Sequence, residues 1–221
     1  MEKKAKYNCL QSLKEAGSPI VIVAAVLEAE AIFNACRNTG IVVSAFCDTE
    51  KIKTHFCGLE VIHTPTLPER FSKARFIIAT QQIQDVVEQL SGLGYDAFYS
   101  ALELLENYDV GKHQHRTSQS YMEAKILVYK KSHAAYLDEE KTYMRSVDVI
   151  ITTRCSLKCV SCSNLMQYYV KPQNAEIDKT FKSLDRFMNS IDWLYEFRVI
   201  GGDPLMNKGW AHIVNGISEK F

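Results

Sequence analysis

Short β-branched runs alternate with helical segments along most of this sequence, and this alternation restricts the possible folds more than any other feature. The expected strands lie at residues 20–23, 41–46, 76–79, 95–99, 147–151 and 195–199. The expected helices lie at residues 27–37, 83–90, 177–191 and 210–217, the last one capped by Asn207. Strands that alternate with helices are typical of parallel sheets whose faces are covered by helices. The sequence therefore predicts an α/β protein.

A polar segment divides the chain into two expected domains. At 221 residues the chain suits one large domain or two small ones, on the usual scale of roughly 100–200 residues per domain. Residues 107–141 are rich in His, Gln, Lys and Tyr and are interpreted as a connector with one helix at 121–131. The expected order is a first domain at 1–106, this connector, and a second domain at 142–221.

Charge and apolar content exclude several classes of partner. The chain has 26 Lys and Arg against 26 Asp and Glu, so no overall charge favours nucleic acid or an anionic membrane. The longest apolar run, residues 19–27, is shorter than the ~20 residues of a membrane span, and residues 1–14 are too charged for a signal peptide. We therefore expect a cytoplasmic protein. In that reducing compartment, seven cysteines indicate thiols or metal ligands instead of disulfides.

Three of these cysteines form a cluster with the spacing C-x3-C-x2-C. Cys155, Cys159 and Cys162 follow directly on the strand expected at 147–151. A loop of this length can wrap an iron–sulfur cubane so that three thiolates reach three irons. Because only three cysteines are offered, the fourth iron is left open for a substrate or cofactor, as in catalytic metal sites. A second motif, Gly201-Gly202-Asp203-Pro204, ends the strand expected at 195–199.

Together, the cysteine cluster and the glycine turn resemble the radical S-adenosylmethionine superfamily. The resemblance implies that Cys155, Cys159 and Cys162 hold a [4Fe–4S] cluster whose fourth iron is chelated by S-adenosylmethionine. It implies that Gly201, Gly202, Asp203 and Pro204 contact the methionyl amino group of that cofactor. It also implies an enzyme that takes an electron from an external donor and reductively cleaves S-adenosylmethionine. The resulting 5′-deoxyadenosyl radical would act on a substrate that the sequence does not identify.

The sequence departs from the family pattern in three places. Ser161 precedes the third cysteine, where the family often has an aromatic residue, and Asp203 replaces the usual Glu. The family barrel has six βα units, whereas residues 147–221 hold about two at roughly 30 residues per unit. We therefore expect a partial barrel and a truncated reading frame or fragment. A catalytically silent module that binds a cluster or zinc is the alternative, and the DNA that follows the codon for Phe221 would help to decide.

Other metal-binding readings are weaker. Zinc prefers four ligands, and His212 is the one candidate for the fourth. His113 and His115 are either a weak metal pair or, as we prefer, part of a solvated linker. The four cysteines outside the cluster are expected to be small buried or half-buried side chains; they are Cys9, Cys36, Cys47 and Cys57. The residues that follow the cluster either line the site or pack; they are Asn164, Met166, Gln167, Tyr168 and Tyr169.

The first domain, over residues 19–106, resembles the Rossmann-like modules of sugar-modifying and polysaccharide-associated proteins. Such folds bind nucleotides through a glycine-rich turn after the first strand, but residues 24–30 contain no glycine. Glu28 and Glu30 add negative charge where a phosphate would lie, and Asp48 alone stands where a ribose-binding acid is found. We expect a degenerate scaffold or interaction module. The substrate implied by this resemblance is a small or sugar-linked molecule of sugar or surface-polysaccharide metabolism.

Overall fold

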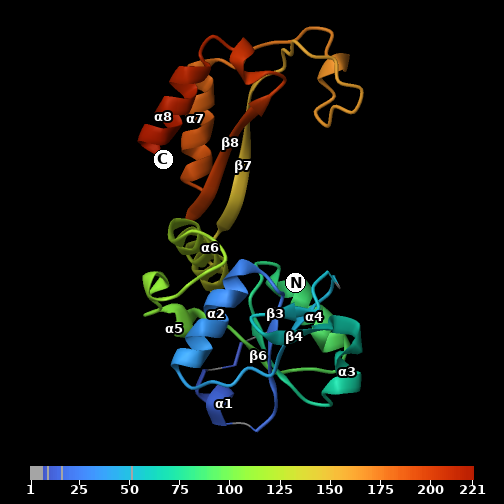
Figure 1. Cartoon of the computed structure of the whole chain (residues 1–221). Coiled ribbons are helices and arrows are strands. Elements are labelled where there is room, and N and C mark those ends of the chain that lie inside the picture. Colours follow the sequence, from blue (N-terminus) through green and yellow to red (C-terminus); the bar gives the residue numbers. More distant parts are fainter. Residues whose placement is uncertain (1–6, 9, 16, 51) are drawn as a thin grey trace. The chain divides into compact units, whose positions relative to one another are not determined.

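The chain forms two compact units, residues 1–139 and residues 140–221 (Figure 1). The structure is a computed structural model, and it describes residues 7–8, 10–15, 17–50 and 52–221. Each unit buries its own apolar side chains.

A six-stranded sheet forms the centre of the first unit, with the strand order β3-β4-β2-β1-β5-β6. Its strands are β1 Ile20–Val23, β2 Ala45–Asp48, β3 His55–Phe56, β4 Leu59–His63, β5 Arg75–Ile78 and β6 Phe98–Tyr99. All neighbouring pairs are parallel except β3 and β4. Alternate residues of β1 enter different cores, Ile20 and Ile22 on one face and Val21 and Val23 on the other, as a sheet buried on both faces requires.

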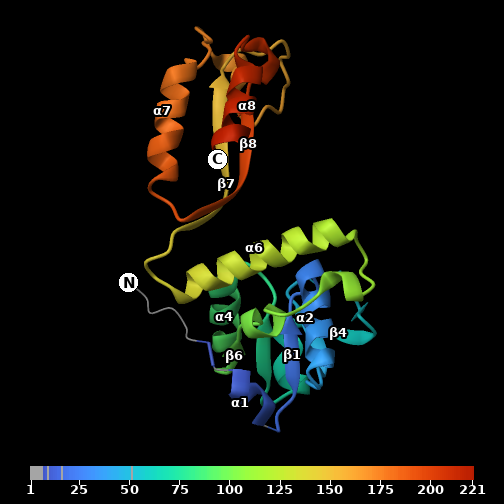
Figure 2. The same cartoon turned by 90° about the vertical axis from the view of Figure 1, so that its left-hand side faces the viewer.

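Helices cover this sheet on both faces (Figure 2). They are α1 Leu10–Glu15, α2 Leu27–Asn38, α3 Leu67–Arg70, α4 Ile83–Gly92, α5 Leu102–Leu105 and α6 Gln119–Leu137. Side chains of α2, α5 and α6 enter the core on one face, and side chains of α4 enter the core on the other. The first unit is therefore a three-layer α/β sandwich.

The interpretation of residues 107–141 as a connector is wrong. Met122, Ile126 and Tyr129 of α6 are buried in the same core as Ile22 of the sheet. The Tyr129 hydroxyl donates to the Ile78 carbonyl at 3.0 Å and accepts from the Ala101 amide at 2.8 Å. Spacings of three and four residues place these side chains on one helix face, so α6 completes the first unit instead of linking two domains.

The hairpin β3–β4 lies between the strands expected at 41–46 and 76–79, where the sequence predicts no strand. Cys57 and Gly58 connect its strands with φ angles of 49° and 80°, the left-handed pair that a two-residue hairpin turn needs. Strands β2 and β6 are shorter than expected, because residues 41–44 and 95–97 lie outside any strand.

The second unit is built on two long parallel strands, β7 Tyr143–Thr152 and β8 Trp193–Gly201. Its helices are α7 Ile177–Met188 and α8 Trp210–Lys220, and both lie along one face of the strand pair (Figure 1). Val149 and Ile151 of β7 pack there against Leu184, Ile213 and Ile217. The expected order of strand, helix, strand, helix is confirmed.

The predicted α/β class is thus confirmed for the described residues. The larger sheet is mostly parallel, and the two-stranded sheet is parallel. No helix in the described part of the chain has the length and apolar content to cross a bilayer.

Candidate functional site

The three clustered cysteines lie on a loop that leaves the carboxyl end of β7. Residues 153–165 of this loop contain neither helix nor strand, and a single 3-10 turn, η3 Met166–Tyr168, follows. Cys155 and Cys162 are half-buried, and Cys159 is exposed. All three thiols are therefore partly accessible from the surface. We call residues 153–165 the cysteine loop.

The glycine turn, Gly201–Pro204, packs directly against the cysteine loop. The Gly202 amide donates to the Thr152 carbonyl at 3.0 Å, and the Asp203 amide donates to the Arg154 carbonyl at 2.8 Å. From the far end of the loop, Asn164 Nδ2 donates to the Gly201 carbonyl at 3.3 Å. The parallel pairing of β7 with β8 brings their carboxyl ends to the same edge, which is where α/β barrels place their chemistry.

Both glycines are required by this contact. A β-carbon on Gly201, whose φ is 152°, would lie 2.2 Å from the Thr152 carbonyl oxygen. A β-carbon on Gly202 would lie 2.1 Å from the Arg154 carbonyl oxygen and 2.9 Å from Cys155 Cβ. The close approach that glycine permits is thus made to the last residue of β7 and to the cysteine loop.

Asp203 connects the two motifs through its carboxylate. Its Oδ2 accepts from the Ser156 hydroxyl at 3.2 Å, and its Oδ1 accepts from the Leu205 amide at 3.2 Å. The second bond caps the 3-10 turn η4, Pro204–Met206. A carboxylate has about four acceptor sites, so this one retains acceptor capacity for a cationic donor.

Backbone amides surround the sulfur of Cys162. The amide of Met166 makes the largest contribution to lowering the pKa of this thiol, and the amides of Asn164 and Leu165 add to it. The Leu157 amide donates to Cys155 Sγ at 3.4 Å. Because the thiolate is the form that binds metals, these bonds favour the form that iron or zinc needs.

The thiols are not drawn together into a metal site in this structure. Among the described residues, no three His, Cys, Asp or Glu side chains are arranged to hold a metal ion. His212, the candidate fourth zinc ligand, packs edge-on against Phe181 with ring centroids 6.0 Å apart. The residue types and the amides around Cys162 fit an iron–sulfur cluster, whereas the loop would have to close for all three sulfurs to bind it.

The side chains that follow the third cysteine divide into two groups. Met166 is buried, whereas Tyr168 and Tyr169 are 72% and 49% exposed. The Gln167 Oε1 atom is buried and has no hydrogen-bond partner. Both tyrosines remain available to a ligand at the surface of the loop.

The cysteines outside the cluster are structural where they are described. Cys36 and Cys47 are buried, and burial raises the pKa of each thiol to about 12. Cys57 is half-buried, and burial raises its pKa to about 11. These positions agree with the expectation, and Cys9 lies outside the described residues.

The solvated linker expected around His113 and His115 is not found. The His113 ring stacks on Tyr108 with centroids 4.9 Å apart, and its Nε2 lies 3.1 Å from Asn38 Nδ2 of α2. His115 Nε2 lies 3.2 Å from the Tyr108 hydroxyl. Both imidazoles therefore pack against the first unit, because they stack on or bond to a tyrosine that contacts its core.

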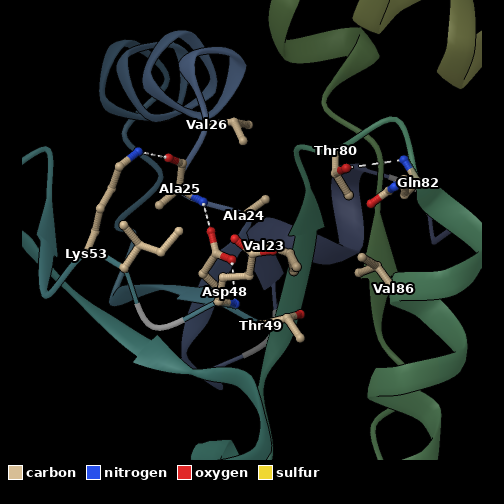
Figure 3. A pocket seen from close by; sticks show the side chains of 12 residues that line it. Val23, Ala24, Ala25, Val26, Asp48, Thr49, Lys53, Thr80, Gln82 and Val86 are labelled. Atoms are coloured by element: carbon tan, nitrogen blue, oxygen red, sulfur yellow. Dashed lines mark hydrogen bonds between the residues drawn. The ribbon is translucent and has the colours of Figure 1, made fainter. Parts of the chain in front are cut away.

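The first unit has a pocket at the carboxyl ends of β1, β2 and β5, with a volume of about 370 Å³ (Figure 3). Its lining residues are Val23, Ala24, Ala25, Val26, Asp48, Thr49, Glu50, Ile52, Lys53, Thr80, Gln82 and Val86. Of these, the sequence had singled out Asp48 and the turn after the first strand. The other lining residues form no sequence motif. They are far apart in the sequence, and only the strand order brings them together.

Glu28 and Glu30 do not face this pocket, contrary to expectation. Both are nearly buried, with 6% and 8% of their surface exposed. Glu28 Oε1 lies 3.8 Å from Lys125 Nζ, and Glu30 Oε1 lies 3.9 Å from Arg116 Nε. Their charge is thus paired with cations of α6 and of the loop that precedes it.

Comparison with known proteins identifies no family. No protein-family model matches the chain, and no curated protein matches it.

Proposed function

We propose that the second unit binds a [4Fe–4S] cluster together with S-adenosylmethionine and that the protein acts as a radical S-adenosylmethionine enzyme. The observation that supports this proposal best is the contact between the cysteine loop and the glycine turn. The loop that carries three cysteines in C-x3-C-x2-C spacing is joined to the Gly-Gly-Asp-Pro turn by a backbone hydrogen bond. The Asp203 amide donates to the Arg154 carbonyl at 2.8 Å.

The chain's own residues have distinct roles in this proposal. Cys155, Cys159 and Cys162 would ligate three irons, and residues Gly201–Pro204 would receive the methionyl amino group. Asp203 offers an acceptor that Ser156 and the Leu205 amide hold in place, which suits an ammonium donor. When bound, the cluster would supply the electron that cleaves the carbon–sulfur bond of S-adenosylmethionine, which gives methionine and a 5′-deoxyadenosyl radical.

The proposal extends to the finer architecture. The second unit would be the first two βα units of a radical S-adenosylmethionine barrel, and the first unit would be Rossmann-like. The substrate would be a small or sugar-linked molecule, and an external one-electron donor would reduce the cluster. A reducing cytoplasm suits exposed thiols that must stay free for iron.

Anaerobic reconstitution with iron and sulfide tests this proposal. We expect about four irons and four sulfides per chain and formation of 5′-deoxyadenosine when dithionite and S-adenosylmethionine are added. Cys155→Ala, Cys159→Ala and Cys162→Ala should each lose the cluster. Cys36→Ala is the matched control, because this buried thiol belongs to the first unit, and it should retain the iron.

Closure of the cysteine loop gives a second readout that does not depend on turnover. Lys158 is exposed and precedes the exposed Cys159, so trypsin should cut after it in the iron-free protein. Cluster binding should slow this cut at least tenfold, because the flanking sulfurs become tied to one group. Stoichiometric zinc in place of iron, or iron retained by all three cysteine variants, would contradict the proposal.

A further inference from the structure

The pocket of the first unit lies where the strand order reverses. From β1 the chain passes through α2 to β2 on one side, and it later returns to β5 on the other side of β1. In open α/β sheets, such a reversal leaves a crevice at the carboxyl ends of the strands, and ligands bind there. The turn after β1 and residues Thr80 and Gln82 after β5 form its walls.

The backbone at this crevice is strained. Ala24 has a φ of 73°, a left-handed conformation that costs an L-residue roughly 1–2 kcal/mol. Non-glycine residues in such conformations cluster at ligand sites, where the surrounding structure holds them. Here Ala24 lines the pocket between Val23 and Ala25 (Figure 3).

The polar groups of the pocket disfavour a phosphate. Asp48 Oδ2 accepts from the Ala25 amide at 2.9 Å, so this amide of the turn already faces a carboxylate. Glu50 adds a second carboxylate to the lining. Among the described lining residues, Lys53 is the one cation, and its Nζ donates a hydrogen bond to the Ala25 carbonyl at 2.5 Å (Figure 3). From the described lining residues, an anion would therefore meet more negative than positive charge.

Hydroxyl groups suit the same pocket. Asp48 accepts from the Ala25 amide on Oδ2 and from the Glu50 amide on Oδ1, at 2.9 and 3.1 Å. A carboxylate has about four acceptor sites, so two remain for donors, and two adjacent hydroxyls of a vicinal diol match that number. The Thr80 hydroxyl lies on the opposite wall, where it accepts from the Gln82 amide at 3.2 Å.

The remaining side chains of the lining suit a flat, apolar part of a ligand. Val23, Val26 and Val86 contribute aliphatic surface, and Ile52 is 77% exposed in the same lining. The volume of about 370 Å³ lies near the lower end of the usual range of roughly 300–1,000 Å³ for ligand sites. A dinucleotide is larger than such a pocket favours, whereas a single nucleoside is of suitable size.

We propose that this pocket binds a ribonucleoside without phosphate. Asp48 binds the two ribose hydroxyls, and the base lies against the aliphatic side chains of Val26, Ile52 and Val86. The Asp48–Ala25 bond gives selectivity against nucleotides, because it occupies an amide of the turn that would otherwise be free to donate to a phosphate oxygen.

Isothermal titration of the full chain with nucleosides tests this inference. At least one of adenosine, guanosine, cytidine and uridine should bind saturably. Its 2′-deoxy form should bind at least tenfold more weakly, and its 5′-monophosphate should also bind more weakly. Tighter binding of the monophosphate or of NAD⁺, binding of glucose or ribose in place of every nucleoside, or no binding by any of the four would overturn the proposal.

Two variants locate the site. Asp48→Asn should weaken nucleoside binding at least tenfold, whereas Asp96→Asn, the same change at an exposed position of the first unit, should not. Because Asp48 also bonds the turn, Val86→Trp gives an independent test: it fills the pocket without removing any hydrogen bond of Asp48. Unaltered binding by both folded variants would overturn the proposal, and the far-UV circular dichroism of each verifies its fold. The variants Cys155→Ala, Cys159→Ala and Cys162→Ala should bind nucleosides as the wild type does. The outcome of this test is therefore independent of whether the second unit binds a cluster.

Discussion

Gly202 lies so close to the cysteine loop that a single methyl group should disturb the second unit. In Gly202→Ala, the new β-carbon would lie 2.1 Å from the Arg154 carbonyl oxygen, and relief of this overlap must move backbone. We expect a loss of about 2–3 kcal/mol in the free energy of unfolding of the second unit, in the range of overpacked sites. Both tryptophans, Trp193 and Trp210, lie in this unit, so urea denaturation followed by tryptophan fluorescence measures it.

Gly92→Ala is the control for this measurement. A β-carbon at Gly92, within α4 of the first unit, meets no atom within 4 Å, and alanine favours helix. It should leave the fluorescence transition unchanged. An unfolding midpoint of Gly202→Ala equal to that of the wild type would mean that the loop adapts freely to the turn.

Single residues show how far sequence reasoning reaches at this scale. The two motifs were predicted. The prediction that Asn207 caps the last helix is wrong, because the N-cap of α8 is Gly209; Asn207 Oδ1 accepts from the Gly209 amide at 2.9 Å in the turn before the helix. The buried bond from Asn207 Nδ2 to the Ile151 carbonyl, at 2.8 Å, was not predicted. Neither was the bond from Ser156 to Asp203. Both depend on the pairing of β7 with β8, which no local pattern specifies.

Among the elements, α6 carries a buried histidine that should make the first unit sensitive to acid. His133 Nε2 donates to the Thr80 carbonyl at 3.0 Å, and Nδ1 accepts from the Tyr7 hydroxyl at 3.0 Å. Burial lowers the pKa of this imidazole to about 3, whereas an unfolded histidine titrates near 6.5. Folding thus favours the neutral form of the His133 imidazole over the protonated form. Stability is fully present above pH 6.5 and is lost as the pH falls toward 3, because only the unfolded chain gains the proton.

The expected loss is about 1.4 kcal/mol for each pH unit below ~6.5. Urea denaturation of the first unit, followed by far-UV circular dichroism between pH 7 and 5, should show a decrease of about 2 kcal/mol. His133→Gln keeps a donor for Thr80 and should flatten this dependence. His55→Gln, at an exposed position of β3, serves as the control. An equal slope in His133→Gln and the wild type would contradict the assignment.

The same helix shows why the burial of an element can escape prediction even when the helix itself is expected. Leu127 and Leu137 of α6 are 46% and 52% exposed, although Met122 and Tyr129 of the same helix are fully buried. Apolar residues on several faces hide the helical period that would identify the buried side. The β3–β4 hairpin was missed for a different reason. Of its two turn residues, Gly58 favours left-handed backbone and Cys57 does not, so the turn has only half of the usual sequence signal. The strands expected at residues 20–23, 76–79, 147–151 and 195–199, by contrast, were located to within a few residues, whereas the strand expected at 41–46 overlaps β2 only at Ala45 and Phe46.

At the scale of the whole molecule, the buried clusters are confined to one unit or the other. The cores of residues 1–139 contain no described residue of the second unit, and the core of residues 140–221 contains none of the first. A unit that buries its own apolar side chains can in principle fold without the other. The two candidate sites, the cysteine loop and the crevice pocket, therefore each belong to a separately stabilised unit.

This independence predicts where the chain can be cut without loss of structure. Glu139 and Glu140 are exposed between the end of α6 and the start of β7. A glutamate-specific protease should cut there early and yield fragments close to 1–139 and 140–221, because exposed backbone between cores is the preferred site of nicking. The double variant Glu139→Gln, Glu140→Gln should resist this cut and serves as the control. After cleavage, tryptophan fluorescence should still report a folded second unit and circular dichroism a folded first unit. Collapse of either fragment on cleavage would show that its core needs the rest of the chain.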